Sequence, residues 1–260
     1  MSSYPFPSYA DRPLSRLISL EGRTAVVTGA ARGIGQAIAR RLTEAGAEVH
    51  GLDWSDEAGN DGIGVRRLDV RDHAAVRAFA DHLARLDIWV NDAGILPVAD
   101  PFDIDEAEWS RVVDTNLTAV FFGCQAAASK MRAQGNGGVI VNIASSLGFH
   151  SVRRQPHYVC SKWGVRGLTA ALANDFGEHG IRVVAVGPGL TDTPGIQAIL
   201  PELNELNEGE SLALAGDAYA AGRVGEPDDI ARAVLFAASD LAGFVTASTI
   251  LADGGEVYAT

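Results

Sequence analysis

Short apolar runs alternate along this chain with longer segments in which apolar residues recur every three or four positions. The run Thr24-Ala25-Val26-Val27 has no charged interruption, which is typical of a strand buried on both faces. Apolar residues then follow helical spacing at Ile34, Ala37, Ile38, Leu42 and Ala45. Because Gly46 ends this pattern, residues 24–46 are predicted to form a strand, a loop and a helix.

The same alternation continues along the rest of the chain. Further strands are expected at residues 48–52, 65–70, 86–90, 139–143, 182–186 and 249–251. Helices are expected at residues 74–86, 106–133, from 158 onwards and at 228–238. Seven strands in βα alternation predict an α/β fold: a Rossmann-type, doubly wound, seven-stranded parallel sheet in a single domain, residues 21–260. Residues 1–20 contain prolines and scattered charges and are expected to form an extended N-terminal arm.

The segment between the first strand and helix is rich in glycine: Thr28-Gly29-Ala30-Ala31-Arg32-Gly33-Ile34-Gly35. Such a loop aims backbone N–H groups and the helix dipole at one point, and its glycines let a diphosphate approach the backbone. Many strand-to-helix turns contain glycine without binding a ligand, but three glycines in this context favour a dinucleotide site. The spacing is G-x-x-x-G-x-G.

Asp53 ends the second predicted strand, eighteen residues after Gly35. A carboxylate there accepts hydrogen bonds from both hydroxyls of the adenosine ribose and repels a 2′-phosphate, which favours NAD over NADP. Arg32 argues for the opposite choice because a cation in the loop can bind a 2′-phosphate, and Asp53 can also simply cap the following turn. The carboxylate carries more weight because its position is the diagnostic one.

Other polar residues also follow predicted strands, at Asp69, Asn91-Asp92-Ala93-Gly94, Ser145-Ser146 and Pro188-Gly189. Ligands bind beyond the carboxyl ends of the strands in doubly wound sheets, so these residues predict the site. Tyr158 and Lys162 lie one helical turn apart on one face. A cation near a phenol lowers its pKa, which would suit proton transfer, although a bare Y-x-x-x-K is more often an ordinary surface pair.

The formal net charge of −12 and the pI near 4.9 argue against a nucleic-acid or anionic-membrane partner. No run of eighteen apolar residues occurs, and a cytoplasmic protein is expected. The two cysteines, Cys124 and Cys160, are expected to be buried, and the six histidines lack metal-ligand spacing, so no metal is expected. His150 and His157 flank Tyr158 and are expected in solvated loops.

In this order and on this topology, the glycine loop, Asn91-Asp92-Ala93-Gly94, Asn116, Ser145 and Tyr158-x-x-x-Lys162 resemble the motifs of the short-chain dehydrogenase/reductase family. The resemblance runs from about Gly22 to Gly255. It implies hydride transfer between a nicotinamide and a carbonyl or carbinol carbon. Tyr158 would be the general acid or base, Lys162 would depress its pKa and bind the nicotinamide ribose, and Ser145 would hold the substrate oxygen. Asn116 would fix a water that links Lys162 to solvent.

The resemblance also implies binding sites and an assembly. Residues expected to bind the cofactor, NAD rather than NADP, are Gly29, Arg32, Gly33, Ile34, Gly35, Asp53, Asp69, Val70, Asn91, Ala93, Gly94, Tyr158, Lys162, Pro188, Gly189, Thr191 and Thr193. Residues expected to bind a small-molecule substrate are Ser145, Leu147 and Tyr158. A homotetramer built through the two long central helices and the C-terminal strand region is expected.

Two positions depart from the family pattern: Asp92 stands where a second asparagine is usual, and Trp163 where a small residue is usual. Residues 190–221 are expected to form a lid. Its acidic residues are Glu202, Glu205, Glu208, Glu210 and Asp217. These charges weakly favour a neutral alcohol, polyol or ketone. Two alternatives stay open: an NADPH-dependent reductase of 3-oxoacyl thioesters, and a non-catalytic dinucleotide sensor or scaffold.

Overall fold

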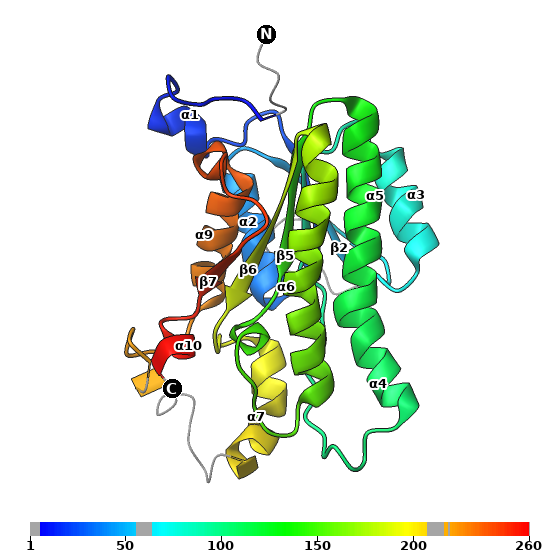
Figure 1. Cartoon of the computed structure of the whole chain (residues 1–260), viewed down its shortest axis with the longest axis vertical. Coiled ribbons are helices and arrows are strands. Elements are labelled where there is room, and N and C mark those ends of the chain that lie inside the picture. The colour runs from blue at the N-terminus through cyan, green and yellow to red at the C-terminus, as the bar shows by residue number, and fades with distance from the viewer. Residues whose placement is uncertain (1–5, 56–63, 207–215, 218, 260) are drawn as a thin grey trace.

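The computed structural model describes residues 6–55, 64–206, 216–217 and 219–259. Seven parallel strands form one sheet in the order β3-β2-β1-β4-β5-β6-β7 (Figure 1). Their bounds are β1 (Thr24–Thr28), β2 (Glu48–Asp53), β3 (Val65–Arg67), β4 (Ile88–Asn91), β5 (Gly138–Ile143), β6 (Ile181–Pro188) and β7 (Thr249–Ala252). The chain winds outward from β1 to β3 and then returns to β4 on the other side of β1. The crevice between β1 and β4 is therefore the switch in strand order where such folds bind ligands.

Helices cover both faces of the sheet. On one face, α5 and α6 run side by side with α3 next to α5, while α2 and α9 pack together on the other (Figure 1). The bounds of these helices are α2 (Gly33–Glu44), α3 (His73–His82), α5 (Ala119–Gln134), α6 (Pro156–Phe176) and α9 (Pro227–Ala238). Further α-helices are α1 (Leu14–Ile18), α4 (Glu106–Val113), α7 (Pro194–Leu206) and α10 (Glu256–Ala259). The predicted doubly wound parallel sheet is confirmed.

The core is divided by the sheet into two layers of apolar side chains. All five residues of β1 are buried, and successive side chains point to opposite faces. Val26 packs in the layer beneath α5 and α6, whereas Val27 packs beneath α2 and α9. This two-sided burial explains why the strand has no charged residue.

Some predicted boundaries were wrong. The third strand ends at Arg67 rather than Val70, because its partner β2 ends at Asp53, whose carbonyl accepts the Leu68 N–H at 2.6 Å, and the chain then turns. The expected helix over 106–133 is three elements, since a π-helical turn, η1 (Asp114–Thr118), joins α4 to α5. Cys124 is buried as expected, but Cys160 is exposed on α6.

The N-terminal arm is not simply extended, because it contains α1 and is fastened to the domain. Arg12 Nη1 lies 2.9 Å from the buried Asp240 carboxylate, which also pairs with Arg23. Leu20 is completely buried in the core and its N–H bonds the Ala45 carbonyl. The packed domain therefore includes Leu20.

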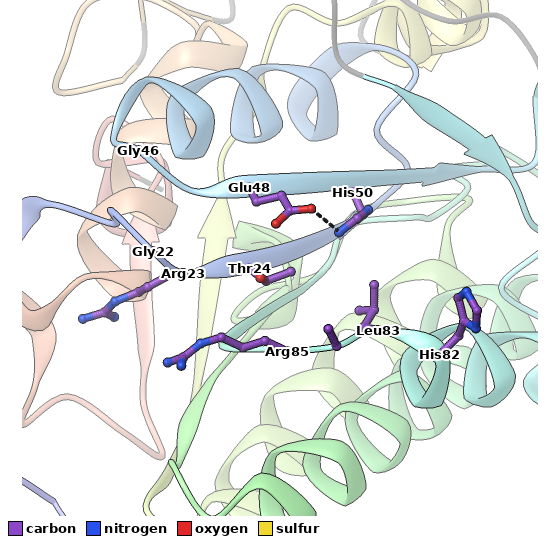
Figure 2. A pocket seen from close by; sticks show the side chains of 10 residues that line it. Gly22, Arg23, Thr24, Gly46, Glu48, His50, His82, Leu83 and Arg85 are labelled. Atoms are coloured by element: carbon purple, nitrogen blue, oxygen red, sulfur yellow. Dashed lines mark ion pairs between the residues drawn. The ribbon is translucent and has the colours of Figure 1, made fainter.

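A cavity of about 470 Å³ lies near the amino ends of β1 and β2 (Figure 2). On the β2 side of this cavity His50 pairs with Glu48, with 3.4 Å between Nε2 and Oε1. Arg85, which also lines the cavity, pairs with Asp87. Because strand amino ends form the edge opposite the switch crevice, this cavity is separate from the site predicted by the sequence.

Candidate active site

The glycine-rich loop between β1 and α2 folds tightly on itself. Gly29 and Gly33 have φ of +72° and +59°, in the left-handed region that favours glycine. A Cβ on Gly35 would lie 2.2 Å from the Gly29 carbonyl oxygen, which no side chain tolerates. No side chain caps α2 at Arg32, and its first turn carries no acidic residue. The start of α2 offers backbone N–H groups and the positive end of the helix dipole, both of which attract a diphosphate.

Asp53 is held against this loop from the end of β2. Its Oδ2 accepts the Ala31 N–H at 3.0 Å, and its Oδ1 accepts the Ser55 N–H at 3.1 Å. The carboxylate is buried, whereas the Arg32 side chain is exposed. The structure thus brings the predicted selector Asp53 to the glycine loop.

Residues 91–94 lie across the switch crevice from that loop. The hydroxyl oxygen of Thr28 accepts the N–H groups of both Asp92 and Ala93, each at 3.1 Å, which joins β1 to the end of β4. The Asn91 amide points into the core, where it donates to Asn142 Oδ1 at 2.9 Å and its Oδ1 accepts the Trp89 indole N–H at 2.7 Å. The Asn91 side chain therefore fixes the strand ends from inside the sheet.

Tyr158 and Ser145 meet at the carboxyl edge of the sheet. Burial, together with the carboxylates of Asp92 and Glu256, raises the pKa of Tyr158 to about 12, while a side-chain hydrogen bond with Ser145 opposes the rise. Tyr158 is therefore a protonated phenol at neutral pH. The expected lowering of this pKa by Lys162 is absent in this structure, where the Lys162 Nζ lies 5.6 Å from the Tyr158 ring centroid.

Lys162 reaches toward the strand rather than the phenol. Its Nζ donates to the Ile143 carbonyl at 2.8 Å, at the end of β5. Burial lowers the pKa of Lys162 to about 8, and the nearby Asp92 carboxylate counteracts part of that effect. Its charge is therefore complete below about pH 8 and is lost as the pH rises through that value.

Asn116 lies in the π-helical turn between α4 and α5 and is completely buried. Its Nδ2 donates to the Ile95 carbonyl at 2.8 Å and its Oδ1 accepts the Ile95 N–H at 2.9 Å. These two bonds occupy the amide and hold the segment after β4 against the helices. A role of Asn116 in holding a water for Lys162 stays a prediction.

The segment after β6 lies over the glycine loop. A Cβ on Gly33 would lie 3.7 Å from the Thr193 side chain, so Thr193 faces the start of α2. Thr191 is buried and donates to the Gly189 carbonyl at 2.9 Å. Asp69, expected near the adenine, pairs with Arg71 at 2.6 Å. Glu208 and Glu210 of the expected lid lie outside the described residues.

Two residues near Tyr158 were not predicted as site residues. His157 is completely buried rather than solvated, and its Nδ1 accepts the Tyr158 N–H at 2.9 Å. Its Nε2 lies 3.6 Å from Glu108 of α4. A histidine directly before the tyrosine was the available signal, because a neutral imidazole can accept one of the unpaired N–H groups in the first turn of a helix.

Glu256 is the second such residue and connects three segments. It is buried at the start of α10, where one oxygen accepts the Ser146 hydroxyl at 3.1 Å and the other accepts the Leu190 N–H at 2.9 Å. His150 Nε2 lies 3.5 Å from the first oxygen. Burial raises the pKa of Glu256. Sequence spacing gives no warning that a residue so late in the chain reaches Ser146.

Known proteins resemble this chain over most of its length. Residues 29–256 match the family model described as Enoyl-(Acyl carrier protein) reductase. The chain is 37% identical over 249 residues to 2-dehydro-3-deoxy-D-gluconate 5-dehydrogenase of Escherichia coli (strain K12), which covers 91% of this chain and 96% of that protein. It is 36% identical over 250 residues to the 3-oxoacyl-[acyl-carrier-protein] reductase FabG of Vibrio cholerae, covering 92% and 98%.

A solved structure is also similar. The gluconate 5-dehydrogenase from Burkholderia cenocepacia J2315 in complex with NADP and tartrate has a TM-score of 0.85 and 31% identity, covering 95% of this chain and 100% of that one. Fold and relatives together define a nicotinamide-dinucleotide oxidoreductase. The chain belongs to the short-chain dehydrogenase/reductase family.

Proposed function

We propose that this enzyme transfers a hydride between NAD(H) and the carbinol or carbonyl carbon of a secondary alcohol, polyol or ketone. The observation that carries the proposal is the meeting of Ser145, Tyr158 and Lys162 at the carboxyl edge of the sheet, beside the glycine-rich loop at the start of α2. Strand ends and a helix start bring together groups that are far apart in sequence. A sensor or scaffold has no need of a proton donor in this position.

A bound nicotinamide supplies the hydride chemistry. Tyr158, which is protonated at neutral pH, is the proton donor to the substrate oxygen in reduction. In oxidation the proton moves the opposite way, so Tyr158 must first lose its own proton and accept the substrate's as the phenolate. Ser145 hydrogen-bonds the same oxygen and so aligns it with Tyr158. Lys162 would hold the nicotinamide ribose through its Nζ, which in this structure bonds the Ile143 carbonyl and does not lower the pKa of Tyr158.

NAD(H) is our preferred cofactor because the buried Asp53 carboxylate lies at the glycine loop and repels a 2′-phosphate. The exposed Arg32 and the NADP in the similar gluconate 5-dehydrogenase favour NADP(H) instead. Steady-state kcat/KM with NADH and NADPH decides between them. We expect NADH to win by at least tenfold, about 1.4 kcal/mol, and Asp53→Ala to reduce that ratio. A tenfold advantage for NADPH in the unaltered enzyme would overturn the choice.

The substrate class is inferred from the charge of the proposed lid, whereas the similar gluconate dehydrogenases are named for sugar acids. Glu202 is exposed on α7, the helix at the start of the proposed lid over residues 190–221, and Leu147 follows Ser145. An acidic lid disfavours anionic substrates, which supports neutral polyols, secondary alcohols and ketones. A panel of such compounds, assayed with both cofactors and in both directions, tests this class. Turnover of anionic sugar acids alone would contradict it.

A second function is favoured by the identity to the 3-oxoacyl-[acyl-carrier-protein] reductase of Vibrio cholerae. An NADPH-dependent reductase of 3-oxoacyl thioesters would use the same Ser145, Tyr158 and Lys162. Including a 3-oxoacyl thioester in the panel separates the two functions, because we expect it to be a poor substrate.

The state of the protein in the cell is also proposed. We expect a homotetramer in the cytoplasm, and the exposed Trp163 on α6 is available to pack against another subunit. Within the described part of the chain, no helix has the length and hydropathy to cross a membrane. Light scattering of the purified protein tests the assembly.

A further inference from the structure

Asp92, which departs from the family pattern, has its side chain inside the glycine loop. Its Oδ2 lies 2.6 Å from the position that a Cβ on Gly35 would take and 3.2 Å from that of a Cβ on Gly29. The Gly35 N–H favours the ionised form of the carboxylate. An acidic side chain thus lies beside one donor of the helix start that a dinucleotide diphosphate approaches.

The charges around Asp92 come from two other elements. Lys162 of α6 favours the ionised carboxylate, while Asp53 of β2 disfavours it, and α2 contributes the Gly35 N–H. The charge of Asp92 acts in turn on Lys162 and Tyr158. Asp92 therefore lies between the proposed cofactor site and the proton-transferring residues. Burial raises its pKa to about 7, so both protonation states are accessible near neutral pH.

We propose that ionised Asp92 holds the glycine loop through Gly35, and that Asp92 takes up one proton from solvent when the dinucleotide diphosphate binds. The inference rests on the proposed dinucleotide site. The reason is electrostatic: a diphosphate brings negative charge close to a carboxylate in a poorly solvated place, and protonation removes the repulsion. The Asp92 carboxylate becomes a carboxylic acid and no other bond changes.

Thermodynamic linkage between proton uptake and binding decides how the affinity for the dinucleotide changes with pH. If binding raises the pKa of Asp92, the dinucleotide binds more tightly as the pH falls, and the dissociation constant rises with pH. The dissociation constant rises by up to about tenfold per pH unit between the Asp92 pKa of the free enzyme and that of the complex. Below the pKa of the free enzyme, or above the pKa of the complex, the dissociation constant no longer depends on pH.

The experiment is isothermal titration of NADH into the full-length protein at several pH values, each in two buffers of different ionisation enthalpy. The unaltered enzyme should take up close to one proton per site at its maximum. Asp92→Asn keeps the shape of the side chain and introduces the residue that the family usually has, so we expect it to fold and to bind NADH with no proton uptake. Asp81→Asn, on the exposed surface of α3, should behave like the unaltered enzyme.

Lys162 is the other group that can exchange a proton on binding. A Lys162→Met variant should still take up the proton, with its maximum shifted to higher pH because the cation that favours ionised Asp92 is gone. Proton uptake that persists in Asp92→Asn, or binding without uptake in the unaltered enzyme, would overturn the inference. Failure of the unaltered enzyme to bind NADH or NADPH at all would instead contradict the proposed function.

Discussion

The chemistry of single residues here depends on burial more than on neighbouring charges. Proximity in sequence suggests that Lys162 lowers the pKa of Tyr158, yet burial raises that pKa to about 12 and the Lys162 Nζ bonds the Ile143 carbonyl. Desolvation penalises the charged form of each group, so Tyr158 stays neutral and the pKa of Lys162 falls to about 8. In the ligand-free enzyme at neutral pH, Tyr158 and Lys162 therefore both carry their protons.

Replacing the phenol tests the role of Tyr158 directly. Tyr158→Phe removes the proton donor but keeps the ring, so kcat should fall by at least about a hundredfold. The dissociation constant for the dinucleotide, measured by fluorescence titration, should change little. Undiminished turnover in this variant would exclude Tyr158 as the general acid or base.

The charge of Lys162 predicts how the activity depends on pH. Since the pKa of Lys162 is about 8, its charge is lost as the pH rises through that value. We expect kcat/KM for ketone reduction, which reports on the free enzyme, to decline above about pH 8. Lys162→Met should be far less active at every pH and should lack this decline. An unaltered enzyme whose kcat/KM stays constant to about pH 10 would contradict the assignment.

Among the helices and strands, sequence patterns predicted those that depend on local spacing and missed those that depend on contacts between elements. Two-sided burial of β1 and the helical spacing from Ile34 to Ala45 were enough to predict the strand, the loop and α2. The π-helical turn at Asn116 was not predictable, because it depends on the bonds between Asn116 and Ile95, which lie on different elements. The same holds for Glu256, whose partners Ser146 and Leu190 come from two other segments.

Glu256 offers a test of how contacts between elements position the site, because it connects the start of α10 to the base of the proposed lid. Glu256→Ala removes the acceptor for both the Ser146 hydroxyl and the Leu190 N–H. We expect the KM for the alcohol or ketone to rise about tenfold, equivalent to about 1.4 kcal/mol, with little change in dinucleotide binding. Glu256→Gln keeps one oxygen acceptor and should recover part of the loss. Equal losses in both variants would assign the effect to charge rather than to positioning.

In the molecule as a whole, the residues that fasten the N-terminal arm and the proposed catalytic residues lie at opposite ends of the strands. Asp240 sits near the amino end of β1 with Arg12 and Arg23, while Ser145, Tyr158 and Lys162 gather beyond the carboxyl ends. The sequence predicted the sheet, and it predicted that these three residues share its carboxyl edge. The boundary of the arm at residue 20 was wrong, because Leu20 packs into the core through contacts that a local pattern does not reveal.

Removing residues 1–12 should therefore affect stability without affecting catalysis. The deletion breaks the Arg12 ion pair and exposes the Asp240 carboxylate, and buried polar groups that lose a partner cost about 1–3 kcal/mol. We expect the midpoint of thermal unfolding to fall by several degrees. Asp11→Asn in the full chain is the matched control. A lower kcat/KM at a temperature where the shortened protein is fully folded would contradict this separation.

The contrast between the two cysteines makes α6 accessible to chemistry from outside. Cys124 is buried, and burial raises its pKa to about 12, whereas Cys160 is exposed two residues from Tyr158 and from Lys162. A thiol reagent should therefore modify Cys160 first. If the long central helices pair between subunits, Cys160 will react slowly at high protein concentration and faster on dilution. The labelling rate thus reports on the neighbours of the catalytic helix without any engineered probe.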